Sequence, residues 1–194
     1  PCERQGAPGR APVCWKLVSP WHCWYKDVGR GTVSVETVCR FVVDVNVGRL
    51  AKWLRVMGYD TLFPREGDDN ELVRIALRED RVLVTRDAGL ANRRAVKQGQ
   101  MRVVKIEGDD LRSQLRQLVR DLGLNLWGGF SRCVRCNEPL RPVDKQKVAE
   151  RVPPYVFEHR RQFMECPRCH RLYWRGTHWS NMVSELERVY LEVH

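Results

Sequence analysis

Short apolar runs alternate with segments of helical periodicity from residue 40 to residue 122. Four runs have the length and β-branched content of buried strands, at 41–44, 59–63, 81–87 and 101–106. Between and after them, apolar residues recur every three or four positions, at 47–57, from a cap at 68 or 69 to 79, at 88–97 and at 111–122. Because strand and helix alternate four times, the pattern predicts an α/β fold with a parallel sheet and helices on both faces.

The regions on either side of this pattern have a different composition. Residues 1–39 are rich in Gly, Pro and Trp without a sustained period, which predicts an irregular N-terminal extension. Gly128 and Gly129 indicate a linker after a first domain at 40–127. A small cysteine-containing module is expected at 131–180, and a tail or short helix at 181–194. A chain of 194 residues suffices for one ordinary domain with such a module.

The chain carries a formal net charge of +10, and its basic residues are spread along the sequence. This distribution favours contact with a polyanion, although a merely soluble basic surface explains it too. Arg49, Lys52 and Arg55 recur every three residues and predict a basic stripe on one helix, for phosphate contact or for solvation. No leader pattern and no membrane-spanning apolar run are found, so we expect a cytoplasmic protein without membrane contact.

Carboxylates follow two of the predicted strands. Asp44 and Asp87 stand at strand ends, and Asp69 heads the helix before the second of these strands, so the three can meet at one sheet edge. Three carboxylates with fewer cationic side chains nearby repel one another unless a divalent ion neutralises them. Their oxygen ligands suit Mg²⁺ or Mn²⁺. Helix capping is the alternative role for Asp69 and Asp87. Thr85 either orients a metal-bound water or satisfies a strand end.

A metal ion at such an edge can polarise a phosphodiester and activate water, so the expected chemistry is metal-assisted phosphodiester hydrolysis. A phospho-accepting domain also uses carboxylates at strand ends. That hypothesis explains neither the basic charge nor the paired cysteines of the second module.

The cysteine module contains two CxxC pairs, separated by 29 residues. Four thiolates in this arrangement can close a tetrahedral zinc site, which leaves no open position for catalysis. Disulfides or a redox motif are the disfavoured alternative in a basic protein of a reducing compartment. We therefore expect a structural Zn²⁺ ion bound by Cys133, Cys136, Cys166 and Cys169.

Aromatic and basic residues alternate just after the second pair, between 173 and 179. Single-stranded RNA is bound by such combinations, since bases stack on rings while cations meet phosphates. Covering a small zinc core is the alternative role, and it is favoured for Tyr173 and Trp174. For Arg175, His178 and Trp179 the two roles are equally supported.

Several of these segments together resemble the Mut-seven C-terminal RNase domain family. The resemblance is carried by residues 44–60 and 82–87, and in the cysteine module by 151–158 and 173–179, although His170 stands where Gly is usual. It covers roughly residues 40–180. It implies a PIN-like three-layer domain with a mostly parallel sheet and an appended zinc ribbon.

The resemblance also implies an RNase site of acidic residues that bind Mg²⁺ or Mn²⁺. Asp44 and Asp87 match two acids of the family. The family usually continues Asp-Asp-Glu-Leu where this chain has an additional Asn70, which leaves more than one alignment of the third acid. Asp69 is assigned because its spacing to the Asp87 motif fits better, with Asp68 and Glu71 as alternatives.

The leading hypothesis is therefore a divalent-metal-dependent ribonuclease acting on single-stranded RNA, with Asp44, Asp69, Asp87 and Thr85 in its catalytic site. The alternative is a non-catalytic RNA-binding or adaptor protein on a degenerate PIN-like scaffold. Oligomeric state is not predicted. The candidate RNA-binding residues are Arg49, Lys52, Arg86, Arg175, His178 and Trp179.

Overall fold

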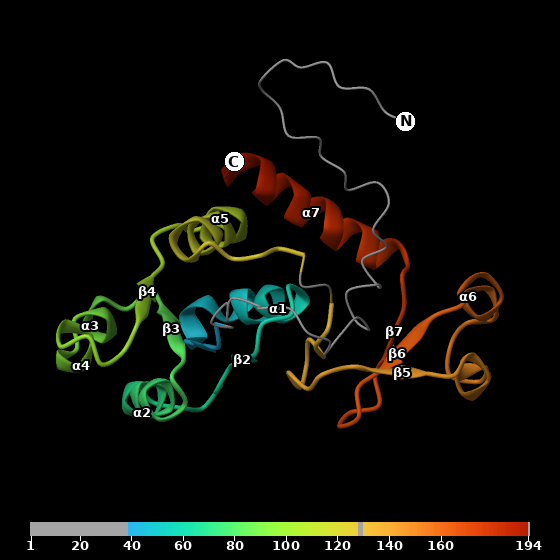
Figure 1. Cartoon of the computed structure of the whole chain (residues 1–194), viewed down its shortest axis with the longest axis horizontal. Helices are drawn as coiled ribbons and strands as arrows, with labels where there is room; N and C mark the ends of the chain where they lie inside the picture. The colour runs from blue at the N-terminus through green and yellow to red at the C-terminus, as the bar shows by residue number, and fades with distance from the viewer. Residues whose placement is uncertain (1–38, 128–129, 194) are drawn as a thin grey trace, which may run out of the picture. The chain divides into compact units, whose positions relative to one another are not determined.

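The computed structural model describes residues 39–127 and 130–193, all of which belong to one compact unit. The predicted N-terminal extension lies outside the described residues, apart from Cys39. The sheet region contains, in chain order, β1 (Phe41–Val43), the 3₁₀ turn η2 (Val45–Val47), α1 (Gly48–Val56), β2 (Thr61–Leu62), α2 (Asp69–Glu79), β3 (Val82–Thr85), α3 (Ala88–Ala91), α4 (Arg94–Lys97), β4 (Val103–Lys105) and α5 (Leu111–Leu122) (Figure 1).

The ribbon region and the last helix follow. They contain β5 (Arg141–Val143), the 3₁₀ turn η3 (Lys145–Val148), α6 (Pro154–His159), β6 (Phe163–Glu165), β7 (Leu172–Tyr173) and α7 (Thr177–Val193).

The first sheet has the strand order β2-β1-β3-β4, and all its strands are parallel. Since β1 lies next to β3 while the chain passes through β2 on the other side, the strand order reverses between β1 and β3. Open α/β sheets bind ligands outside the carboxyl ends of the strands at such a point. The α/β class predicted from the sequence is confirmed.

Helices cover both faces of this sheet because the strand side chains alternate. Phe41 and Val43 of β1, with Val84 of β3, pack in one cluster with α1 and α5. Val42 and Leu83 point the other way and pack with α2 and α3. Figure 1 shows the resulting three layers, and the buried strands give no exposed apolar face.

Several helix ends follow the sequence signals. Asp68 caps α2 by accepting a hydrogen bond from the Glu71 N–H at 2.7 Å, and Asp110 caps α5 in the same manner. Gly123 ends α5 with φ of 60°, a conformation that glycine adopts without steric cost.

The helix predicted at 88–97 is two short helices, α3 and α4. The side chain of Asn92 donates to the Ala88 carbonyl at 2.8 Å, and Arg93 takes an extended conformation that interrupts the helix. Its guanidinium then reaches Asn70 at 3.1 Å and Asp69 at 3.8 Å. The Asn92 backbone N–H still donates to the Ala88 carbonyl at 3.0 Å, so the helix is interrupted at Arg93 and not at Asn92.

The ribbon is an antiparallel sheet in the order β5-β6-β7 with a small core of its own. Val148, Val152 and Phe163 form that core, and the Trp174 ring lies 6.3 Å from the Phe163 ring. Trp174 therefore packs on the apolar core of the ribbon, whereas the role favoured from the sequence was to cover the zinc core. So few buried residues provide little hydrophobic stabilisation, and domains of this size depend on a metal or a disulfide.

α7 packs on the sheet region and not on the ribbon core. Leu186 and Val189 are buried in the cluster that contains α1 and α5. Arg112 of α5 donates to Glu185 at 2.9 Å, and Arg116 donates to Glu192 at 3.1 Å. The stretch expected as a tail or short helix from 181 is therefore the larger part of a 17-residue helix.

Arg55 departs from the basic stripe predicted on α1. Its side chain is buried, with a relative exposure of 8%, and donates to the carbonyls of Thr61, Val134 and Arg135. It therefore ties α1 and β2 to the first cysteine pair. Arg49 and Lys52, the other two members of the stripe, are exposed.

Asn137 makes the second connection between the sheet and the ribbon. Its side chain accepts from the Thr61 N–H at 2.9 Å and donates to Asp60 at 2.8 Å, so it occupies the outer edge of β2. Its backbone is left-handed, with φ of 67°. The edge position explains why β2 has two residues where the sequence predicted a strand over 59–63.

Replacing Asn137 with Ala is expected to lower the free energy of unfolding by about 2–4 kcal/mol. The change leaves the buried Thr61 N–H without an acceptor and forces Ala into a left-handed conformation. Urea unfolding of the zinc-loaded protein measures the loss. Asn137→Gly, which removes the hydrogen bonds but keeps the permitted backbone, should lose less; equal stability of the Ala variant and the parent would contradict this account.

Candidate metal sites

Asp44 directly follows β1 and is almost fully buried, with a relative exposure of 4%. Its N–H donates to the Val84 carbonyl at 2.9 Å, which continues the pairing of β1 with β3. Its Oδ2 accepts from the Thr85 hydroxyl at 2.7 Å and from the Asn46 amide at 3.2 Å. Within the described residues, no Lys, Arg or His forms an ion pair with this carboxylate. Buried charges are normally paired or coordinate a metal, so the position fits a cation.

Thr85 connects the two strand ends. It is fully buried, and its hydroxyl donates to Asp44 and accepts from the Asp87 N–H at 2.9 Å. Asp87 is exposed, and its Oδ1 accepts from the Leu90 N–H at 2.7 Å as the cap of α3. The second Asp87 oxygen takes no part in that cap. The structure thus brings Asp44 and Asp87 to neighbouring ends of β1 and β3, linked through one hydroxyl.

Asp69 is the first residue of α2, and the cap of that helix is Asp68. Its side chain is 57% exposed and lies 3.8 Å from the Arg93 guanidinium. Across the described part of the chain, the cysteines alone form a group of three or more metal-binding side chains with ligand atoms within 4.8 Å of one another. Asp44, Asp69 and Asp87 therefore do not form a closed cage of carboxylates.

The four cysteines of the two CxxC pairs come together with the geometry of a metal site. Cys133 and Cys166 are buried, and Cys136 and Cys169 are half-buried. The Sγ atoms of Cys133 and Cys169 are 3.6 Å apart, close to the separation of about 3.8 Å that two thiolates have on a tetrahedral zinc ion. This set of donors fits Zn²⁺.

Hydrogen bonds around Cys133 favour its thiolate form. Burial alone would raise the pKa of the Cys133 thiol, but hydrogen bonds from the Tyr173 hydroxyl at 3.1 Å and from backbone N–H groups, among them that of Cys136 at 3.3 Å, lower it to about 7. The thiolate is the form that binds zinc. Asn137 and His170, which each follow the second cysteine of a pair, have left-handed backbones. In the family that the sequence resembles, Gly is usual at position 170, and Gly adopts a left-handed backbone without steric cost.

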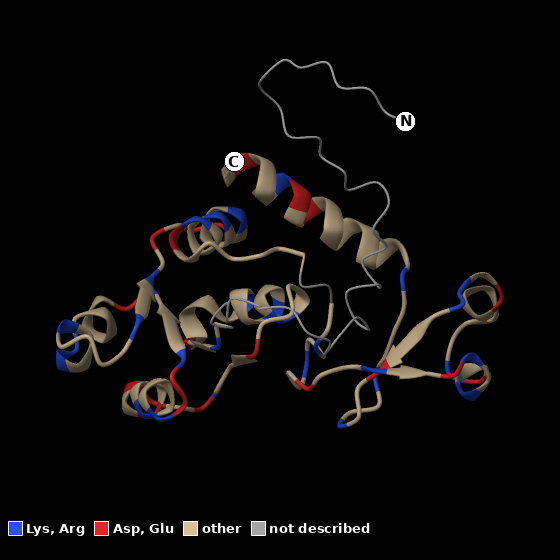
Figure 2. Ribbon diagram, viewed as in Figure 1, with Lys and Arg blue, Asp and Glu red and all other residues tan. Residues whose placement is uncertain are grey.

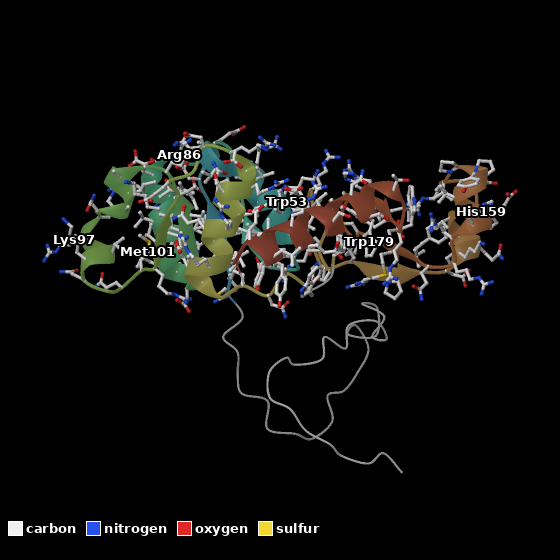
Figure 3. The ribbon with its side chains drawn as sticks, turned by 90° about the horizontal axis from the view of Figure 1, so that it is seen from above. Trp53, Arg86, Lys97, Met101, His159 and Trp179 are labelled. Carbon is white, nitrogen blue, oxygen red and sulfur yellow. The ribbon has the colours of Figure 1, made fainter. Side chains whose placement is uncertain are left out.

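The candidate RNA-binding residues of the sheet region differ in their surroundings. Arg86 forms an ion pair with Asp109 at 2.5 Å, and its side chain is 40% exposed. Figure 3 shows Arg86 at the outside of the molecule. Arg49 and Lys52 point from the exposed side of α1. Basic residues are spread over most of the described elements, as Figure 2 shows.

The other candidates lie between β7 and the first turn of α7. The Arg175 guanidinium lies over the Trp179 ring at 5.0 Å, and that ring packs on Phe130 at 5.5 Å. His178 is exposed. Trp179 therefore also helps to hold the start of α7 against Phe130, a structural role in addition to the expected RNA contact.

Three residues next to these sites were missed from the sequence. Arg93 faces Asp69, while Arg55 and Asn137 fix the first cysteine pair to β2. Asn137 carries a signal in its position, since the residue after a knuckle's second cysteine adopts a left-handed backbone that Asn tolerates. The sequence holds no such signal for Arg55 or Arg93, because their partners are backbone carbonyls or residues distant in sequence.

Comparison with known proteins yields one match. A family described as Mut7-C RNAse domain matches residues 39–186, which cover the sheet region, the ribbon and half of α7. Neither the curated proteins nor the solved structures yielded a match. In the part of the chain that is described, no helix combines the length and apolar character needed to cross a membrane.

Proposed function

Because the chain belongs to the Mut7-C RNAse domain family, we propose that it is a divalent-metal-dependent ribonuclease that hydrolyses phosphodiester bonds of single-stranded RNA. The observation that carries the proposal is the buried Asp44 carboxylate, which has only neutral hydrogen-bond partners among the described residues. It lies at the switch point of the parallel sheet, beside the strand that ends at Asp87.

The residues of this edge have separate tasks in the proposal. Asp44 and Asp87 hold Mg²⁺ or Mn²⁺, and Asp69 approaches from α2 as the third acid. The ion that these residues would hold would supply Lewis-acid chemistry toward the phosphodiester and water. Thr85 is a positioning residue, since its hydroxyl fixes the Asp44 carboxylate and the Asp87 backbone at once.

The zinc ribbon has a structural and an RNA-holding role in the proposal. Zn²⁺ bound by the four cysteines folds the ribbon, and with four protein ligands it keeps no open position for chemistry. Arg175, His178 and Trp179 contact RNA from the ribbon side, and Arg49, Lys52 and Arg86 meet phosphates from the sheet side.

A metal-titrated cleavage assay tests the function. Zinc-loaded protein is freed of other divalent ions and incubated with end-labelled single-stranded RNA while Mg²⁺ or Mn²⁺ is added. Cleavage that rises and saturates with either ion supports the proposal. RNA retention without cleavage at any ion concentration would favour the non-catalytic RNA-binding alternative.

Replacing Thr85 with Val is expected to raise the half-saturating Mn²⁺ concentration by about 10- to 100-fold, the usual effect of losing a group that orients a metal ligand. Val has nearly the same shape but cannot donate to Asp44. Thr85→Ser is the matched control, because it keeps the hydroxyl. Equal Mn²⁺ dependence of the Val and Ser variants would rule out the positioning role.

A further inference from the structure

A pocket of about 570 Å³ lies where the two cysteine pairs meet the end of β2. Residues 62–64 form its wall on the sheet side, and the second cysteine of each pair forms part of the other wall. Three arginines line it, and none of the described residues around it is Asp or Glu. Its size suits a nucleotide-sized group, and its charge suits an anion.

The two CxxC pairs supply the same cation at the same position. Arg135 and Arg168 each stand directly before the second cysteine of a pair, and both line the pocket. Both side chains are exposed, and neither forms an ion pair or hydrogen bond with the residues that the structure describes. Their planar guanidinium groups are available to an external partner, and phosphate is the anion that this geometry matches.

Arg55 is the third arginine of the pocket and acts differently. Its donors are used by the carbonyls of Thr61, Val134 and Arg135, so its position is fixed. Burial lowers the pKa of the Arg55 guanidinium, but arginine remains a cation at neutral pH. It contributes a fixed positive potential beside the two exposed arginines.

Phe63 connects this pocket to the sheet edge at which Asp44 and Asp87 lie, which we call the catalytic edge. Its ring lines the pocket and also lies so close to Gly48 that a methyl group there would overlap it. Gly48 begins α1, four residues after Asp44. Arg65 adds a cation over the Phe63 ring, with 5.8 Å between the guanidinium carbon and the ring centroid.

We infer that this pocket binds the phosphate backbone of single-stranded RNA and directs the strand past Phe63 toward Asp44 and Asp87. The inference rests on the proposed function for the choice of RNA as the anion. Arg135 and Arg168 are the principal contacts. A purely structural role, in which both arginines offset the charge of the zinc thiolates, predicts a loss of zinc on mutation and no specific effect on RNA.

The test measures RNA binding in a chain that cannot cleave. Two double variants are made in the zinc-loaded Asp44→Asn protein. The pocket pair combines Arg135→Gln and Arg168→Gln, and the matched control pair combines Arg102→Gln and Arg120→Gln. Both control residues are exposed. Arg102 directly precedes β4 and Arg120 lies in the last turn of α5, so the control pair removes equal charge from residues that do not line the pocket. Fluorescence anisotropy with labelled oligouridylate gives the dissociation constant at several salt concentrations, and metal analysis gives the zinc content.

The pocket pair is expected to weaken binding by about tenfold or more, and to make the salt dependence shallower by about 1.4 in log–log slope, since two phosphate contacts are lost. The control pair should change the dissociation constant by less than about twofold. Zinc content should remain at the parent value in both. Pocket and control pairs that bind RNA equally would overturn the inference.

Should the pocket pair lose zinc, crosslinking of RNA containing 4-thiouridine to the Asp44→Asn protein decides instead. Adducts at Phe63 or beside Arg135 and Arg168 support the inference, and adducts confined to other regions overturn it. The result is independent of cleavage. RNA bound in the pocket without metal-stimulated hydrolysis would remove the proposed function only, and hydrolysis without pocket binding would remove the inference only.

Discussion

The Asp44→Asn variant is expected to cleave single-stranded RNA about a thousandfold more slowly than the parent chain. A factor of that size corresponds to about 4 kcal/mol of lost transition-state stabilisation, within the range that a bound metal ion supplies. Asn is a weaker metal ligand, but its amide oxygen can still accept the Thr85 hydroxyl. Initial rates at saturating Mn²⁺ measure the effect.

The same variant gives a second result that a merely structural role of Asp44 would not produce. Without a divalent ion, the parent has a buried carboxylate that no cation among the described residues neutralises. Removing that charge should leave the melting temperature of the metal-free protein unchanged or raise it. Asp87→Asn should also lose activity and keep its fold, because Asn is an equally good helix cap.

Asp121→Asn is the matched control for both changes, since this carboxylate lies in α5 at the opposite edge of the sheet. It should retain the parent activity. Full activity of both Asp44→Asn and Asp87→Asn would contradict the assignment of the catalytic edge, whatever their stability.

Removal of zinc is expected to unfold the ribbon between residues 131 and 176. Structural zinc in small modules contributes an apparent free energy of about 10–16 kcal/mol near neutral pH, far more than the ribbon core of Val148, Val152 and Phe163 supplies. A zinc chelator should therefore expose Trp174 and open the ribbon to protease. Tryptophan emission and limited proteolysis follow the change, and RNA binding should fall with it.

Cys39→Ser serves as the control for this second prediction. Cys39 packs against the sheet region and is not one of the four clustered cysteines. Its replacement should leave one zinc ion per chain and an intact ribbon, whereas Cys166→Ser should behave as the chelated protein. A ribbon that resists protease after metal analysis shows zinc to be absent would contradict the structural role.

Much of the sheet region was predictable because its strands are buried on both faces. Phe41 to Val43 and Val82 to Thr85 are apolar without interruption save for the last hydroxyl, and that pattern has few alternatives. Helix ends were predictable where one residue decides them, as at Asp110 and Gly123. The break between α3 and α4 was not, because it lies at Arg93, whose side-chain partners Asn70 and Asp69 are distant in sequence.

The candidate sites were predictable to a different extent. Position in the chain placed Asp44 and Asp87 at strand ends, and spacing alone indicated the four cysteines. The burial of Asp44 and the link through Thr85 depend on which strands are neighbours, which no local pattern records. Arg55 seemed to belong to an exposed stripe because helical spacing says nothing about a second module that covers one end of the helix.

The return of the chain as α7 makes folding of the sheet region dependent on a segment that is synthesised after the ribbon. Leu186 and Val189 belong to the same cluster as β1, α1 and α5, so that cluster has an open side until residues 177–193 have been synthesised. During translation, a sheet region that emerges first must wait for the ribbon and then for α7, with apolar surface exposed in the meantime. The ribbon, whose core is separate, can bind zinc and fold before the domain that precedes it in the sequence is complete.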